Sequence, residues 1–95
     1  MSIVIVGGNE CMVRRYIDLC RDYNCRAKVF CKMRDGLKNG IGSPDLMVLF
    51  TSTMSHKMIK FALGEVKGTS TMIERSHSAS LCALREILDR TAVRV

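Results

Sequence analysis

The two histidines of the sequence, each beside serine or threonine residues, are the side chains with the clearest chemical potential. His56 ends the run TSTMSH at positions 51–56, and His77 lies in the run RSHS at positions 75–78. Imidazole binds metals and exchanges protons near neutral pH, and hydroxyl groups donate hydrogen bonds to anions. These residue types indicate an anion site, a metal site or a hydrolytic Ser–His pair, depending on which structural elements position them.

Four short runs of the sequence predict the β-strands. Residues 2–6 and 45–50 are almost continuously apolar, as strands covered on both faces are. Residues 26–31 alternate basic with apolar side chains, which suits an edge strand. Residues 69–74 supply the fourth strand. A helical pattern follows every predicted strand except the second.

Apolar residues at helical spacing predict three helices. The first starts at the N-cap Asn9 and ends at Asn24, the second ends at Gly68, and the last opens at positions 76–78. Glycines between positions 32 and 44 limit any helix there to a short piece. The buried helix faces are expected to contain Met12, Val13, Tyr16, Ile17, Cys20 and Tyr23, then Met58, Ile59, Ala62, Leu63 and Val66, then Leu81, Leu84, Ile87 and Leu88.

Strands that alternate with helices along 95 residues indicate parallel pairing and right-handed crossovers. We therefore predict a single α/β domain over residues 1–95, Rossmann-like or flavodoxin-like. Its four-stranded parallel sheet has the strand order 2-1-3-4, with helices on both faces. Because so short a chain has no room for a separate lid, we expect any pocket to be shallow or completed by a second copy.

The predicted topology gives the place of a ligand site. In an open parallel sheet, ligands bind beyond the carboxyl ends of the strands, where the strand order reverses. The loops at 7–10, 51–56 and 75–78 meet at this edge, and each leads into a helix whose first N–H groups favour an anion. Capping alone also accounts for each of the serines and threonines. The expected ligand-binding residues are Gly7, Gly8, Asn9, Thr51, Thr53, Ser55, His56, Arg75, Ser76, His77 and Ser78.

A metal or haem site is the alternative use of the two histidines. His56 and His77 would supply two nitrogen ligands, with Cys11, Glu10 or water as a third. The sequence contains no Cys-x-x-Cys or His-x-x-x-His pair, so its spacing is not diagnostic of zinc or iron. Five cysteines, an odd number in a chain with no secretion signal, indicate reduced thiols and not a disulfide framework.

The sequence supports binding better than catalysis. Ser55 with His56, and Ser76 with His77, are sequence neighbours, and neighbours do not face each other on a helix. No Gly-x-Ser-x-Gly, spaced three-glycine dinucleotide motif or Walker motif occurs. The sequence therefore favours a binding or sensing module for a phosphate-bearing or nucleotide-like anion. It identifies no cofactor and leaves enzymatic activity undecided.

The charge of the chain bears on its partners. A net charge of +6, from 15 Lys and Arg against 9 Asp and Glu, permits a nucleic-acid or structural partner. The few aromatic residues are expected in the core, so stacking on bases is not expected. Arg34, Lys57 and Arg75 flank the carboxyl edge and favour phosphate. We also expect a homodimer, because so short a chain cannot cover the edges of its sheet. We expect a cytoplasmic protein with no membrane segment.

The runs TSTMSH at 51–56 and RSHSASL at 75–81, in this order and spacing, resemble those of a family of small bacterial proteins. This family is known as the domain of unknown function twenty-three twenty-five. The resemblance extends from the glycine pair at 7–8 to the final helix. It implies a Rossmann-like domain and supports the choice of the three loops, and it implies no particular substrate.

Overall fold

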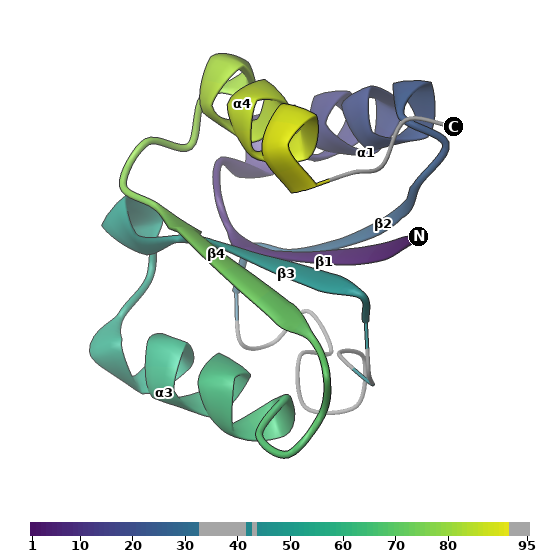
Figure 1. Ribbon diagram of the computed structural model, residues 1–95. Coiled ribbons are helices and arrows are strands. Elements are labelled where there is room, and N and C mark those ends of the chain that lie inside the picture. The colour runs from purple at the N-terminus through teal and green to yellow at the C-terminus, as the bar shows by residue number, and fades with distance from the viewer. Residues whose placement is uncertain (33–41, 43, 92–95) are drawn as a thin grey trace.

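The computed structural model describes residues 1–32, 42 and 44–91 of the chain (Figure 1). Arg34, and almost all of the segment between Lys32 and Pro44 where only a short helix is expected, lie outside these residues. Within the described part of the chain, no helix combines the length and the apolar character that crossing a membrane requires.

Four parallel strands form one sheet. They are β1 (Ser2–Gly7), β2 (Arg26–Phe30), β3 (Leu46–Phe50) and β4 (Met72–Ser76), in the spatial order β2-β1-β3-β4. The central strands β1 and β3 are the two apolar runs, and every residue of β3 is buried. The parallel pairing, the strand order and the edge position of β2 confirm the predicted α/β topology.

Helices cover both faces of the sheet, as predicted (Figure 1). On one face α1 (Val13–Asp22) lies against α4 (Leu81–Thr91), and on the other face lies α3 (His56–Glu65). Because side chains alternate along a strand, β1 sends Ile3 toward α1 and α4 and Val4 toward α3. Two apolar layers result. The predicted helix residues that are buried in them are Tyr16, Cys20, Met58, Ala62, Val66, Leu84, Ile87 and Leu88.

Asn9 and Asn24 mark the two ends of the first helical segment, as predicted. The Asn9 side chain accepts a hydrogen bond of 2.9 Å from the Cys11 N–H and caps a 3-10 turn, η1 (Glu10–Met12), that leads into α1. Asn24 has a φ of 58°, and the Cys25 N–H donates to the Cys20 carbonyl at 3.0 Å. This left-handed residue with its returning hydrogen bond is a Schellman-type end of a helix.

The prediction of the fourth strand as 69–74 was wrong by about half its length. The hydroxyl of Thr69 donates to the Val66 carbonyl at 2.7 Å and accepts from the Thr71 N–H at 3.3 Å. These bonds fold residues 69–71 into a turn after α3, so pairing with β3 begins only where the Met72 N–H donates to the Asp45 carbonyl. As a result, Arg75 and Ser76 belong to β4 and not to a loop.

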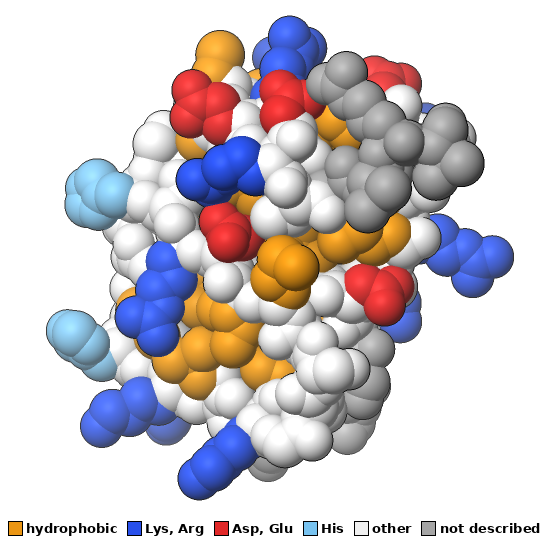
Figure 2. Space-filling view, viewed as in Figure 1, with side chains coloured by type: hydrophobic (Ala, Val, Ile, Leu, Met, Phe, Trp, Pro, Cys, Tyr) orange, Lys and Arg blue, Asp and Glu red, His pale blue; other side chains and the backbone are white. Residues whose placement is uncertain are grey.

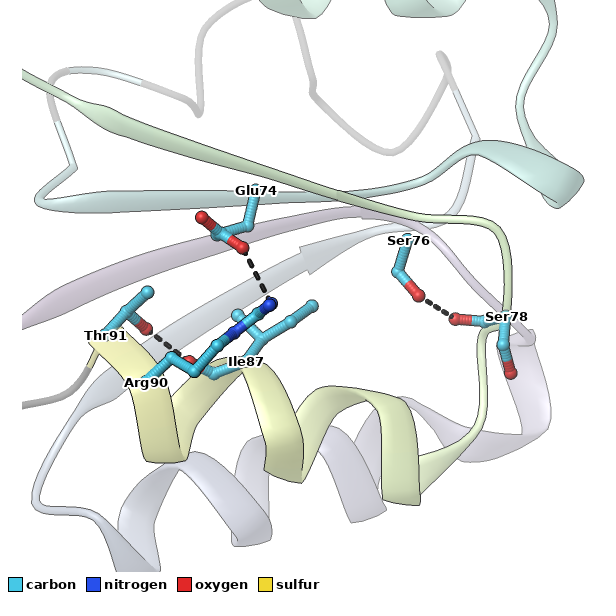
Figure 3. Close-up of polar contacts among 6 residues, drawn as sticks. All are labelled: Glu74, Ser76, Ser78, Ile87, Arg90 and Thr91. Carbon is cyan, nitrogen blue, oxygen red and sulfur yellow. Dashed lines mark hydrogen bonds and ion pairs between the residues drawn. The ribbon is translucent and has the colours of Figure 1, made fainter.

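The last helix begins later than the predicted positions 76–78. The Ser76 hydroxyl donates to the Ser78 carbonyl at 2.8 Å and holds a bend (Figure 3). Ser80 is the residue that caps α4: its hydroxyl accepts from the Ala83 N–H at 3.2 Å, and its carbonyl begins the helical ladder. Several serines in a row offer several possible caps, and the sequence alone does not distinguish among them.

An ion pair ties β4 to α4. The Arg90 guanidinium donates to the Glu74 carboxylate at 2.8 Å across the gap between strand and helix (Figure 3). Arg90 is well exposed, so the pair contributes only modestly to stability. It does neutralise the one acidic side chain of β4.

Replacing the capping serine tests where α4 begins. We expect Ser80→Ala to lower the free energy of unfolding by about 1 kcal/mol, because the N–H groups of the first turn lose their acceptor. Ser52→Ala is the matched control, since Ser52 is exposed and lies in a short 3-10 turn with no side-chain cap. Urea unfolding measures both. A neutral Ser80→Ala together with a destabilising Ser76→Ala would place the helix start at the earlier serines.

Candidate functional site at the carboxyl edge of the sheet

The three predicted loops lie at one edge of the molecule. The strand register places Gly7 beside Phe50 and Phe50 beside Ser76, so β1, β3 and β4 end level with one another. The loops that follow these strands therefore emerge side by side, at the left of Figure 1. This arrangement confirms that parallel strand ends bring the three sequence segments together.

Hydrogen bonds join the three loops directly. The Gly8 N–H donates to the Thr53 hydroxyl at 2.6 Å, and that hydroxyl donates in turn to the Phe50 carbonyl at 2.9 Å. The Thr51 hydroxyl donates to the Ser76 carbonyl at 3.4 Å. Two of the expected ligand-binding threonines thus hold the edge together.

Tyr16 is a structural residue of this edge whose role the sequence reasoning missed. It was expected in the buried stripe of the first helix, and it is fully buried, with its ring 5.3 Å from that of Phe50. Its hydroxyl donates to the Ala79 carbonyl at 2.6 Å and accepts from the Asn9 N–H at 3.3 Å. One side chain of α1 therefore connects the first and third loops. The sequence signal that could have revealed this role is a tyrosine at a buried helix position, because a buried tyrosine hydroxyl needs a hydrogen-bond partner.

The glycine pair at the first loop is required by close packing. Gly7 and Gly8 have φ angles of 87° and 90°, which residues other than glycine rarely adopt. A Cβ atom on Gly7 would lie 2.9 Å from the Phe50 carbonyl oxygen, and one on Gly8 would lie 2.9 Å from Cε2 of Tyr16. The backbone of this loop thus needs both glycines even without a ligand.

Other polar groups of the expected set also serve the structure. The Asn9 side chain caps η1, and the Ser55 hydroxyl caps α3 by accepting from the Met58 N–H at 3.2 Å. Ser76, the last residue of β4, and Ser78 bond within the segment that leads to α4. The capping interpretation therefore holds for Asn9 and Ser55, whereas Ser76 and Ser78 make local bonds before the start of α4.

The basic and imidazole side chains of the edge remain exposed. His56, Arg75 and His77 make no side-chain hydrogen bond or ion pair within the described residues. Figure 2 shows both histidines, pale blue, standing apart along the left edge with basic side chains on the same side. Glu10 is the acidic residue of the three loops, and Lys32 pairs with it at 2.7 Å. Among the described residues, the edge therefore presents one unpaired guanidinium, that of Arg75, and two unpaired imidazoles.

The described side chains offer few ligands for a metal ion. Among the residues that the structure describes, no group of three or more His, Cys, Asp or Glu side chains is placed to hold one. Cys11, named as a third ligand, is exposed. Burial, with a smaller contribution from Cys25, raises the pKa of Cys20 to about 12, so this thiol stays protonated at neutral pH. A metal or haem at His56 and His77 stays a prediction from the sequence.

A hollow of about 460 Å³ lies where α1 turns into β2. Because this turn precedes the amino end of β2, the hollow is at the opposite edge of the sheet from the three loops. Its basic residues make no ion pair within the described part of the chain, and the sequence reasoning did not identify the site. The lining residues are Ile17, Arg21, Asn24, Cys25, Arg26, Ala27 and Lys28.

The fold and the edge define a class: a small Rossmann-like α/β domain with three joined loops at the carboxyl ends of its strands. Residues 2–91 match the family model described as "Uncharacterized protein conserved in bacteria (DUF2325)". The chain belongs to this bacterial family, as the motifs at 51–56 and 75–81 indicated. No curated protein is significantly similar to the chain. No solved structure matches it significantly either.

Removal of the Tyr16 hydroxyl tests the connection between the loops. We expect Tyr16→Phe to lower the free energy of unfolding by about 1–3 kcal/mol, because the Asn9 N–H and the Ala79 carbonyl lose their partner. Tyr23→Phe is the control, because the Tyr23 hydroxyl bonds Asp89 in an exposed setting and should matter less. Chemical unfolding of the two variants makes the comparison. Equal stabilities would mean that the Tyr16 hydroxyl does not join the loops.

Proposed function

We propose that this domain binds a small phosphate-bearing anion at the carboxyl edge of its sheet, as a binding or sensing module. The observation that supports this most directly is the Arg75 guanidinium, unpaired within the described part of the chain, at the edge where three loops are hydrogen-bonded into one unit. A rigid, positively charged edge attracts anions and holds the groups that bind them in fixed positions.

The guanidinium and imidazole side chains, more than the loop hydroxyls, carry this proposal. The guanidinium of Arg75 can bind two phosphate oxygens at once. His56 is the first residue of α3, next to the N–H groups of a helix start, and His77 is exposed just after the end of β4. The hydroxyls of Thr53 and Ser55 already have structural partners and contribute less. Because the charges are exposed, we expect salt to weaken binding.

Thermal unfolding in the presence of anions tests the proposal. Inorganic phosphate and ADP, at low ionic strength, should raise the melting temperature. A ligand at about ten times its Kd adds about 1.4 kcal/mol to the unfolding free energy, and each kcal/mol is about 4–8 °C for a domain of this size. The variant with His56→Ala, Arg75→Ala and His77→Ala should lose this shift. Lys67→Ala, which removes an exposed charge after α3, should retain it.

Two results would contradict the proposal. The first is no shift with phosphate, ADP or a wider panel of nucleotides. The second is an equal shift in the triple variant and in Lys67→Ala, which would show non-specific ion binding to a basic protein.

A second candidate function follows from the hollow between α1 and β2. Arg21, Arg26 and Lys28 surround it and could contact successive phosphates of a nucleic acid. Both tyrosines and all three phenylalanines are either buried or half-buried, so bases would have no platform for stacking. We therefore expect weak binding that does not depend on sequence.

The salt dependence of DNA binding distinguishes this candidate. Fluorescence anisotropy with a labelled duplex should give an affinity that falls as salt rises, by a slope of about 0.9 for each phosphate contact. Arg21→Ala, Arg26→Ala and Lys28→Ala together should reduce that slope. Lys57→Ala with Lys60→Ala, on the opposite face, is the control. A slope that the hollow and control variants reduce equally would remove the hollow as the contact site.

A further inference from the structure

The outer edge of β4 is exposed and apolar. Met72 and Ile73, neighbours in this strand, keep 48% and 38% of their surface exposed. In the described part of the chain the only other large apolar side chain with such exposure is Met1. Figure 2 shows hydrophobic side chains, orange, over β4 and between β4 and α3. An edge strand with apolar side chains readily pairs with another strand.

The opposite edge of the sheet is protected against such pairing. There β2 exposes Arg26 and Lys28, and charged side chains on an edge strand discourage a further strand from adding. In β4 the only charged residues are Glu74 and Arg75, and Arg90 already neutralises Glu74. The two edges therefore differ in their readiness to pair.

The backbone of β4 presents bonding groups outward at alternate residues. The Met72 N–H donates to the Asp45 carbonyl, so Met72 faces β3. In a parallel ladder, residues that bond the neighbour alternate with residues whose N–H and C=O point away. Ile73 and Arg75 thus present their N–H and C=O groups to the outside.

We propose that two copies of the chain pair through β4, antiparallel and across a two-fold axis at Ile73, to form one continuous sheet. In this register the N–H of each Ile73 donates to the Ile73 carbonyl of the other copy. The N–H of each Arg75 donates to the Thr71 carbonyl of the other copy. The two Ile73 side chains meet on the face that bears α3, beside Met47, the register partner of Ile73.

Charge disfavours two other registers of this pairing. An axis at Glu74 would place two carboxylates opposite each other, and an axis at Arg75 would do the same with two guanidinium groups; like charges in these positions are destabilising. With the axis at Ile73, Glu74 lies opposite Met72 and Arg75 lies opposite Thr71. This register keeps like charges from lying directly opposite each other and brings the exposed Ile73 of one copy against the Ile73 of the other, so a second copy of the chain fits this edge.

The mass of the protein in solution tests the pairing. Light scattering at micromolar concentration should give twice the 10.6 kDa of the chain. Ile73→Lys should halve that mass, because the axis would then join two cations. Lys28→Glu, on the other edge, is the control and should leave the mass unchanged. Circular dichroism checks that each variant folds.

A cysteine at the axis tests the register without depending on Ile73→Lys. Hydrogen-bonded antiparallel partners have Cα atoms about 5.5 Å apart, within the range of about 4.4–6.8 Å that a disulfide spans. With the exposed Cys11 and Cys82 replaced by serine, Ile73→Cys should cross-link into a covalent dimer when oxidised with copper phenanthroline. Met72→Cys is the matched control and should cross-link poorly, because each Met72 lies opposite Glu74.

Three results would overturn the pairing. One is a mass of 10.6 kDa, that of a single chain, in the light-scattering measurement. Another is a dimer that Ile73→Lys leaves intact, which would place the contact elsewhere. The third is faster cross-linking of Met72→Cys than of Ile73→Cys, which would refute the axis at Ile73.

Discussion

The apolar character of β1 and β3 on both faces is the constraint on which the rest of the structure depends. A strand that is buried on both sides needs a helix layer above and another below it, and parallel neighbours need crossover connections to supply them. When crossover connections supply both helix layers, all strands run in the same direction and their carboxyl ends lie at the same edge. The joined loops, the basic edge and the exposed flank of β4 are consequences of that single arrangement.

Periodicity predicted the elements that bury most surface, and it failed where hydroxyl residues decide the boundaries. The burial of β3 and the apolar stripe of α4 were clear because a wrong assignment would expose apolar side chains. Thr69 and Thr71 have high strand propensity, yet their hydroxyls bond locally and make a turn. Of the serines between β4 and α4, any is an acceptable cap by type, and in the structure Ser80 is the one that caps the helix.

The candidate site was predictable in position but not in chemistry. Parallel topology alone brings 7–10, 51–56 and 75–78 to one edge, so the choice of loops needed no side-chain detail. Which hydroxyls stay available to a ligand depends on bonds between residues far apart in sequence. Gly8 and Thr53 are 45 positions apart, and Tyr16 and Ala79 are 63 apart. No local pattern reports such pairs, so Thr53 was assigned to a ligand although the protein uses it itself.

The order in which the layers are synthesised follows from the position of α4 along the chain. This helix supplies Leu84, Ile87 and Leu88 to the layer that also covers Ile3 and Ile5 of the first strand. During translation this face of the first strand therefore stays partly uncovered until a helix about 80 residues later has been synthesised. Such contacts between distant parts of the sequence slow folding. Until then a growing chain exposes apolar surface beside the ribosome, where a chaperone or a neighbouring chain can reach it.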